Sequence, residues 1–219
     1  MPVLFPDPES ATPEGIVAAG GNLEPATLLE AYAKGLFPWY SEGMPILWWS
    51  PDPRMVLFPD GLKVSHSLRQ TLRAGKYSCR VDTAFPEVIE QCAVVPRHGQ
   101  EGTWITPEMK KAYIRLHELG YAHSFETYHG EELAGGLYGV SLGAAFFGES
   151  MFHLMPDASK VALYHLVQWC KTYRFDFIDA QTPTDHLASL GAREIPRREF
   201  LEMLEEAMKK ETVIGKWSL

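Results

Sequence analysis

The sequence predicts a mixed α/β fold in which helices pack on a sheet built around a hairpin. Residues 132–152 (ELAGGLYGVSLGAAFFGESMF) form two strand-like apolar runs, joined at residues 141–143 by a short connection that contains glycine. Residues 175–181 (FDFIDAQ) form a third apolar run, whose side chains would alternate between two faces. A segment with helical spacing separates the hairpin from this run, so helices and strands share one unit.

The helices before the hairpin are predicted from their capping residues and their periodicity. The first begins at Pro25 and ends at Gly35. A second is expected over residues 85–93, and Thr106 caps a third that runs to Gly120. The apolar positions are Leu28, Leu29, Tyr32 and Leu36 in the first helix and Met109, Ala112, Tyr113 and Leu116 in the third.

Loops and one further strand connect these helices to the hairpin. We expect a loop through Pro96, Gly99 and residues 102–106, then, after the third helix, a strand over residues 122–128. A tight turn at residues 129–130 leads from that strand into the hairpin.

The segment after the hairpin completes the predicted unit. Asp157 can cap a helix whose apolar residues recur at helical spacing, and a last helix is expected over residues 197–209. The order from residue 83 is two helices, three strands, a helix, a strand and a helix, which is typical of the acetyltransferase-like α/β class. We therefore expect an acetyltransferase-like domain over residues 83–219, behind a small α/β domain over residues 1–82.

Composition describes an ordinary globular chain. It has 219 residues, of which 46% are hydrophobic and 22% charged, enough for a sizeable core. No apolar run approaches 18 residues, and the first ten residues lack the features of a signal peptide, so we expect a cytoplasmic protein without a membrane partner. Three cysteines suggest reduced thiols, and eight scattered histidines predict no metal site.

Charge is distributed unevenly along the chain. The net charge of −8 argues weakly against nucleic-acid binding, because phosphate neutralisation needs lysine and arginine. Residues 54–80, however, contain one acid, Asp60, among several basic residues. This patch is either the solvated face of a helix or a contact for an RNA backbone. Its basic residues are Arg54, Lys63, Arg69, Arg73, Lys76 and Arg80.

Carboxylates stand where buried strands normally carry none. Asp179 and Gln181 share one face at the end of their strand, roughly 6 to 7 Å apart. Gly148 directly precedes Glu149, and a glycine inside a strand suggests a bulge, which could turn Phe146 and Glu149 toward one pocket. A solvated or capping role is the alternative for each carboxylate. Two carboxylates and an amide on adjacent strands favour a functional site.

Tryptophans are concentrated in the first fifty residues. FPWY at residues 37–40 and ILWWSPDPR at residues 46–54 place three tryptophans among prolines. Such rings can fill a core, or they can form a platform on which a nucleotide base stacks. The pattern alone leaves both interpretations open.

Several motifs, in order along nearly the whole chain, resemble the bacterial leucyl/phenylalanyl-tRNA–protein transferases. The resemblance implies transfer of leucine or phenylalanine, and less readily methionine, from aminoacyl-tRNA to an amino-terminal arginine or lysine, which marks the protein for degradation. It implies no cofactor and no DNA partner. The motifs are GGNL at residues 20–23, AYAKGLFPWY at 31–40, ILWWSPDPR, GTWIT at 102–106, FFGESMF at 146–152, ASK at 158–160, IDAQ at 178–181 and HLASLGAREIPRR at 186–198.

The resemblance also implies roles for individual residues. Asp179 would bind the attacking amine, as a base or electrostatically, with Gln181 as a relay, while Glu149 would fix the donor amino acid or the adenosine. The terminal adenosine of the tRNA would contact Trp39, Trp104 and Tyr32. The donor side chain would lie among Leu137, Phe146, Leu163, Leu166 and Ile178.

Two other functions remain open at the level of sequence. A coenzyme-A-dependent acetyltransferase would share the fold, but residues 153–160 (HLMPDASK) lack the glycine-rich turn that holds a pyrophosphate. A non-catalytic RNA-binding module could use the basic patch and the tryptophans, but would not need Asp179 with Gln181. His153 and Thr184 depart from residues common in the family, which bears on contacts with the acceptor.

Overall fold

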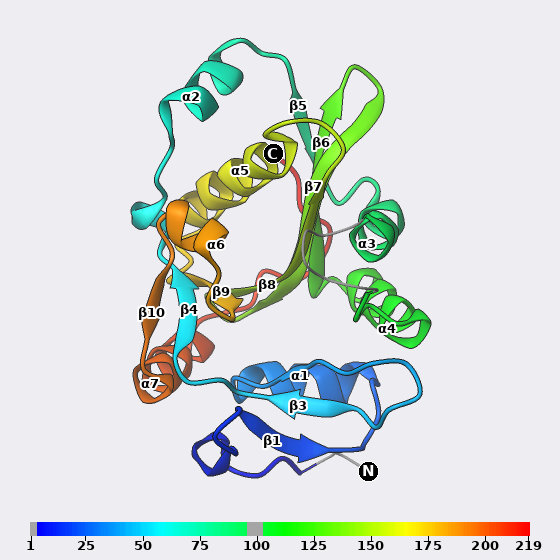
Figure 1. Ribbon diagram of the computed structural model, residues 1–219, viewed down its shortest axis with the longest axis vertical. Coiled ribbons are helices and arrows are strands. Elements are labelled where there is room, and N and C mark those ends of the chain that lie inside the picture. The colour runs from blue at the N-terminus through cyan, green and yellow to red at the C-terminus, as the bar shows by residue number, and fades with distance from the viewer. Residues whose placement is uncertain (1–3, 96–102) are drawn as a thin grey trace.

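A computed structural model describes residues 4–95 and 103–219 and places a seven-stranded mixed sheet at the centre of the protein (Figure 1). The strands β8 and β9 are parallel, and every other neighbouring pair in this sheet is antiparallel. This arrangement confirms the predicted mixed α/β class. In sheet order the strands are β10 (Arg193–Ile195), β4 (Arg54–Leu57), β9 (Phe177–Gln181), β8 (Ala145–His153), β7 (Glu132–Leu142), β6 (Ala122–His129) and β5 (Ser78–Val81).

The hairpin β7–β8 carries the predicted bulge. Tyr138 pairs with Ser150 and Gly139 pairs with Gly148, so Glu149 is the extra residue on β8. A bulged residue interrupts the regular alternation of side chains between the two faces of the sheet. The Glu149 side chain can therefore point to a face that strict alternation would not allow. The connecting turn lies at Gly143, whose φ is +55°.

Helices cover both faces of the sheet (Figure 1). On one face lie α3 (Phe85–Val94) and α4 (Pro107–Glu118), which Thr106 caps as predicted, and on the other lies α5 (Ala158–Thr172). Asp157 precedes α5, but its side chain makes no capping hydrogen bond and its carboxylate forms an ion pair with Lys160. The remaining short elements are α2 (His66–Arg73), α6 (Asp185–Ser189) and the 3₁₀ turns Pro8–Ser10 and Pro59–Gly61.

A second, three-stranded sheet and α1 (Pro25–Ala33) form the amino-terminal part. The sheet order is β1 (Ile16–Ala19), β3 (Leu47–Trp49) and β2 (Phe37–Pro38). The carboxy-terminal helix α7 (Arg197–Met208) packs against α1, so two helices that are far apart in the sequence lie side by side. The predicted helix from Pro25 is confirmed, and Gly35 follows its end with φ +76°.

Some sequence predictions concern segments that the structure places differently or does not describe. Strands β4 and β5 precede residue 83 but belong to the large sheet, so a boundary at residue 82 would divide that sheet. A two-part organisation of the chain stays a prediction. Most of the predicted loop around Pro96 and Gly99 falls outside the described residues. Within the part of the chain that is described, no helix has the length and apolarity of a membrane-spanning segment.

Close packing along the hairpin predicts that two glycine substitutions lower stability by different amounts. A Cβ at Gly139 would lie 2.2 Å from the carbonyl oxygen of Phe147 and 2.5 Å from the ring of Phe146, whereas one at Gly148 would meet nothing closer than 3.5 Å. We expect Gly139→Ala to cost about 1–3 kcal/mol in the free energy of unfolding, because overpacking forces the backbone to shift. Gly148→Ala is the matched control and should cost less than about 1 kcal/mol in urea unfolding. Equal losses in the two variants would contradict this account of the hairpin.

Candidate active site

A cavity of about 970 Å³ lies beside the amino-terminal half of α5 and the bulged end of β8. Its volume is in the range of sites that hold small molecules. One part of its wall is apolar and another carries polar side chains, so it can bind a group of mixed character. The lining residues that the argument uses are Trp39, Trp104, Leu137, Glu149, Leu163, Leu166, Ile178, Asp179 and Gln181.

Glu149 is the polar centre of this cavity. Its Oε1 accepts hydrogen bonds from the Tyr32 hydroxyl at 2.7 Å and from Gln181 Nε2 at 2.9 Å. Its Oε2 accepts one from the Tyr113 hydroxyl at 3.1 Å. The hydroxyls of Tyr32 and Tyr113 also contact each other. These donors come from α1, α4 and β9, so three elements converge on one bulged carboxyl group.

Burial controls the acidity of this group. Glu149 is 7% exposed, and loss of hydration raises the pKa of its carboxyl group to about 7, although the hydrogen bonds from Tyr32, Tyr113 and Gln181 oppose that rise. Burial likewise raises the pKa of both phenols well above the usual value, so they remain hydrogen-bond donors at neutral pH. Glu149 can therefore both take and release a proton near neutral pH.

Asp179 lies in a different environment, although it borders the same cavity. Its two carboxylate oxygens accept hydrogen bonds from Arg54 Nε at 2.9 Å and Nη2 at 2.7 Å. Both side chains are fully buried, and the Arg54 guanidinium also lies over the rings of Phe37 and Phe200. The negative charge of Asp179 is thus balanced within the protein, which favours a structural or electrostatic role.

Gln181 connects the two carboxyl groups. Its backbone N–H donates to Asp179 Oδ1 at 2.9 Å, while its side-chain amide donates to Glu149. The residue has φ +64°, so it leaves regular strand geometry at the end of β9. Asp179 thereby fixes the conformation from which Gln181 reaches Glu149. The predicted group of Glu149, Asp179 and Gln181 is brought together, with the side-chain amide bonded to Glu149.

The apolar part of the cavity contains most of the residues expected for a side-chain pocket. Leu137, Leu163, Leu166 and Ile178 line the cavity. Phe146 does not, because it lies fully buried behind the wall and its ring occupies the space beside Gly139. The bulge therefore turns Glu149, but not Phe146, into the cavity.

The two tryptophans predicted to contact a nucleoside also line the cavity. Trp39 is 41% exposed and its ring lies 5.3 Å from that of Trp49. Trp104 is half-buried in the segment before α4. Tyr32, which was grouped with them, is 1% exposed and is engaged with Glu149. Of these three residues, Trp39 and Trp104 line the cavity and Tyr32 does not.

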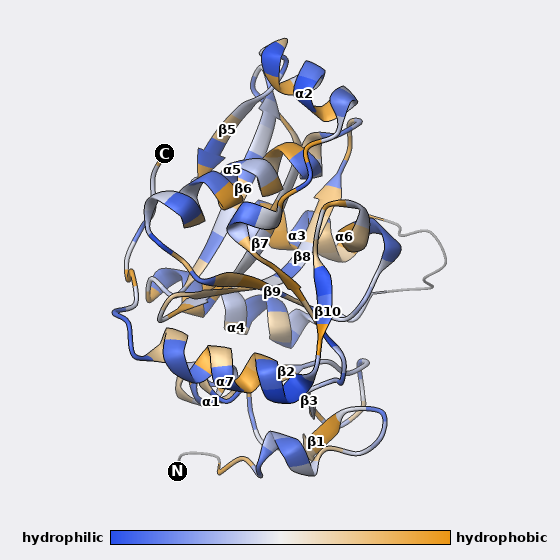
Figure 2. Ribbon diagram, turned by 90° about the vertical axis from the view of Figure 1, so that its left-hand side faces the viewer, coloured by the Kyte–Doolittle hydropathy of each residue, from blue (hydrophilic) through white to orange (hydrophobic). Residues whose placement is uncertain are grey.

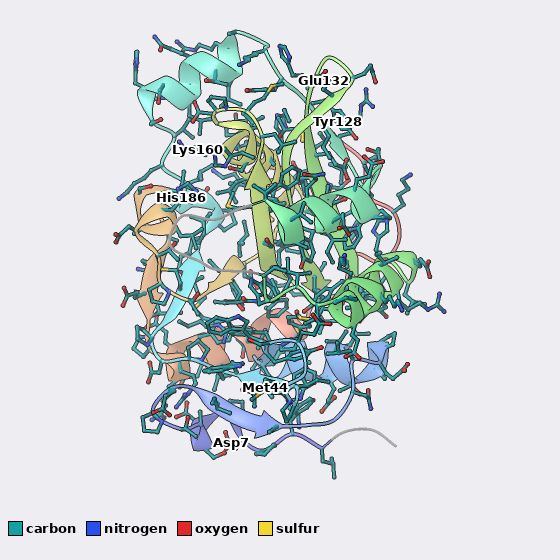
Figure 3. All side chains as sticks on the ribbon, turned by 45° about the vertical axis from the view of Figure 1, so that its right-hand side comes forward. Asp7, Met44, Tyr128, Glu132, Lys160 and His186 are labelled. Carbon is teal, nitrogen blue, oxygen red and sulfur yellow. The ribbon has the colours of Figure 1, made fainter. Side chains whose placement is uncertain are left out.

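The rim of the cavity carries ionisable groups. Lys160 on α5 and His186 on α6 lie close together at one edge of the molecule (Figure 3). Asp157 also lines the cavity, and its carboxylate accepts a hydrogen bond from Lys160 Nζ at 2.9 Å. A negative charge at the start of α5 disfavours a pyrophosphate at this helix terminus.

The predicted basic patch divides into exposed and buried members. Lys63, Arg69, Arg73 and Lys76 are exposed on or beside α2, and Arg80 forms an ion pair with Glu131. Arg54 is fully buried against Asp179, so its assignment to an RNA backbone contact was wrong. Its position at the start of the apolar run of residues 55–58 was the signal of a buried strand. Tyr113 was predicted only as a buried helix position, and its hydrogen bond to Glu149 was not predicted.

Metal ligands do not gather in this site. Across residues 4–95 and 103–219, no group of three or more histidine, cysteine, aspartate or glutamate side chains could hold a metal ion. The three cysteines are free thiols.

The fold and the cavity define an enzyme class. An apolar pocket that adjoins a buried carboxyl group with a pKa near neutrality is suited to proton transfer beside an apolar substrate group. The family model described as leucyl/phenylalanyl-tRNA protein transferase matches residues 56–205, and the model of that family's amino-terminal domain matches residues 21–52. This chain belongs to the leucyl/phenylalanyl-tRNA protein transferase family and is an aminoacyltransferase.

Curated relatives agree with this assignment over nearly the full chain. A leucyl/phenylalanyl-tRNA–protein transferase of Myxococcus xanthus is 59% identical, covering 99% of this chain and 93% of its own length. One from Anaeromyxobacter sp. is 58% identical, covering 99% and 92%. Solved structures include L-PGS from Bacillus licheniformis, with a TM-score of 0.39 and 15% identity over 75% of this chain and 58% of that one. A TM-score this low carries no argument about the family, so the assignment depends on the sequence comparisons alone.

The Arg54–Asp179 pair predicts a large stability effect. We expect Arg54→Met to lower the free energy of unfolding by about 3–5 kcal/mol, because it leaves the Asp179 carboxylate buried without a counter-charge. Arg80→Met is the matched control, since it removes a solvent-exposed ion pair with Glu131 and should cost far less stability than Arg54→Met. Combining Arg54→Met with Asp179→Leu should recover most of the lost free energy of unfolding, measured with urea. A small effect of Arg54→Met alone would contradict the buried pairing.

Proposed function

We propose that this aminoacyltransferase moves leucine, phenylalanine or methionine from aminoacyl-tRNA to proteins that begin with arginine or lysine. The observation that carries the proposal is that one cavity joins an apolar pocket to the hydrogen-bonded carboxyl group of Glu149. The donor side chain occupies the pocket, and the aminoacyl ester lies at its polar end. Degradation of the product and a location in the cytoplasm stay predictions from the family resemblance.

The apolar wall supports the range of donors. Leu137, Leu163, Leu166 and Ile178 offer flexible aliphatic surface without a polar group to match. Burying a leucyl or phenylalanyl side chain contributes roughly 1.5–3 kcal/mol, and such pockets separate substrates that differ by one methylene only about 10- to 200-fold. Leucine, phenylalanine and methionine are therefore acceptable together, and discrimination among them depends on shape.

Proton transfer is assigned to Glu149 in this proposal. The neutral α-amine of the acceptor attacks the ester carbonyl, the new C–N bond forms, and the C–O bond to the terminal ribose breaks. The proton lost by the amine must reach the departing ribose oxygen. A carboxyl group with a pKa of about 7 is suited to accept and return that proton, because the reference pKa of an α-amine is about 7.7–8.0.

Asp179 and Gln181 act by positioning in the same proposal. Both carboxylate oxygens of Asp179 accept hydrogen bonds from Arg54, so its side chain is already engaged within the protein. Its hydrogen bond to the backbone of Gln181 instead holds the side-chain amide against Glu149. The ester is already activated, so positioning can supply much of the acceleration.

The tRNA is proposed to approach across the rim of the cavity. Trp39 and Trp104 would stack on or contact the terminal adenosine, since aromatic faces bind any base. The exposed basic residues of α2 would contact the RNA backbone. Helix α2 lies near the cavity because the hydroxyl of Thr71 contacts Asp157, which lines it. Such contacts make binding weaken as salt rises.

Transfer can be tested with radiolabelled leucyl-tRNA and two peptides that differ only in beginning with arginine or glycine. We expect labelling of the arginine peptide and little of the glycine peptide. Glu149→Gln should reduce the rate by about 10²- to 10⁴-fold, the usual contribution of general acid–base catalysis. Glu126→Gln is the matched control, because Glu126 is also a buried, hydrogen-bonded carboxyl group but does not line the cavity.

The pH dependence separates Glu149 from the acceptor amine. The carboxylate form is the base, so the wild-type rate should rise as pH passes upward through about 7, in addition to the rise due to the amine. In Glu149→Gln the rate should rise with pH only because the acceptor amine loses its proton. Equal profiles in wild type and Glu149→Gln would exclude Glu149 as the base, and labelling of neither peptide by intact wild-type protein would reject the proposed transfer.

A further inference from the structure

The segment after α7 packs into the core beside the apolar pocket. Trp217 is 3% exposed and lies within the core that α5 forms with the large sheet. Its ring stacks on Trp169 and on His123, with centroid distances of 3.5 Å to each, and contacts Phe146 at 6.1 Å. This segment enters from the side of the molecule opposite α6, which borders the cavity entrance (Figure 2).

Two elements lead from the cavity to this ring. On α5, Leu166 lines the cavity and Trp169, almost one turn later, stacks on Trp217. On β8, Glu149 lines the cavity and Phe146 contacts Trp217. Trp217 therefore belongs to the same packed core as the lining residues Leu166 and Ile178, and Trp169 and Phe146 connect it to the cavity wall.

The position of Trp217 is fixed by hydrogen bonds rather than by a strand or helix of its own. Its backbone N–H donates to Asp82 Oδ2 at 2.8 Å, and its indole N–H donates to the Val213 carbonyl at 3.0 Å. Asp82 also bonds His123, on which the indole stacks. Gly215 N–H donates to the Gly120 carbonyl at 3.1 Å. These contacts hold one large ring against the wall while the segment around it is irregular.

We propose that Trp217 is a positioning residue that sets the depth of the donor pocket and thereby excludes side chains larger than phenylalanine. The proposal depends on the proposed function, because it concerns the same pocket. Trp217 acts through Phe146, which its ring contacts, and through Trp169, which lies almost one turn after Leu166 on α5. Removing the ring would leave an apolar space into which those side chains can retreat.

The test compares donors of two sizes on Trp217→Ala. We would measure transfer to the arginine peptide from tRNA charged with phenylalanine or with 2-naphthylalanine, and competition binding of the corresponding amide-linked 3′-aminoacylaminoadenosines. The preference for naphthylalanine relative to phenylalanine should rise by about 10- to 200-fold, the range associated with a methylene-sized change in an apolar pocket. Trp217→Phe, which opens less space, should give a smaller rise and remains informative if Trp217→Ala does not fold.

Controls distinguish pocket depth from general loosening. Phe85→Ala removes a fully buried ring on the opposite face of the sheet and should leave the donor ratio unchanged. Added indole should refill the space in Trp217→Ala and return the ratio toward wild type, since apolar cavities bind small aromatic molecules. An unchanged ratio in folded Trp217 variants, or an equal rise in Phe85→Ala, would overturn the inference. If wild type transfers neither donor, the proposed function fails, and the binding ratios still test the depth of the pocket.

Discussion

The site depends on keeping one carboxyl group out of water while surrounding it with neutral donors. Glu149 achieves this because a bulge in β8 turns it into the cavity, where two tyrosines and one amide bind its oxygens. Burial without these donors would be too costly, and full charge pairing would make the group a weak base. The combination leaves a carboxyl group that titrates near neutral pH, beside an apolar pocket.

Arg54 and Asp179 provide the complementary arrangement on the adjoining strands. Strand β4 places Arg54 beside β9, where it forms an ion pair with Asp179. Without Arg54, the Asp179 carboxylate would lie buried in the same cavity as Glu149 with no counter-charge. Asp179 also accepts a hydrogen bond from the backbone N–H of Gln181, and through it affects the position of that residue. Two carboxyl groups in one cavity thus have different environments, because one is bound by a cation and the other by neutral hydroxyl and amide groups.

Local patterns predicted those features whose causes are local. Gly148 before Glu149 predicted the bulge, Thr106 with Pro107 predicted the start of α4, and alternation predicted β9. The ion pair joins residues 125 positions apart, so no spacing in the sequence could reveal it. Grouping Arg54 with neighbouring basic residues failed because strand formation buries it. Tyr113 was predicted as a buried position, but its hydroxyl partner depends on how α4 packs against the bulge.

The pKa of the Glu149 carboxyl group can be measured directly by titration. Carboxyl carbons can be followed by ¹³C NMR in protein labelled at glutamate, from pH 4 to pH 9, with Glu149→Gln identifying the signal. We expect one glutamate signal with a midpoint near pH 7 that is absent from Glu149→Gln. A Glu149 signal that titrates near the ordinary value of about 4.3 would contradict the claim that this buried group carries the proton.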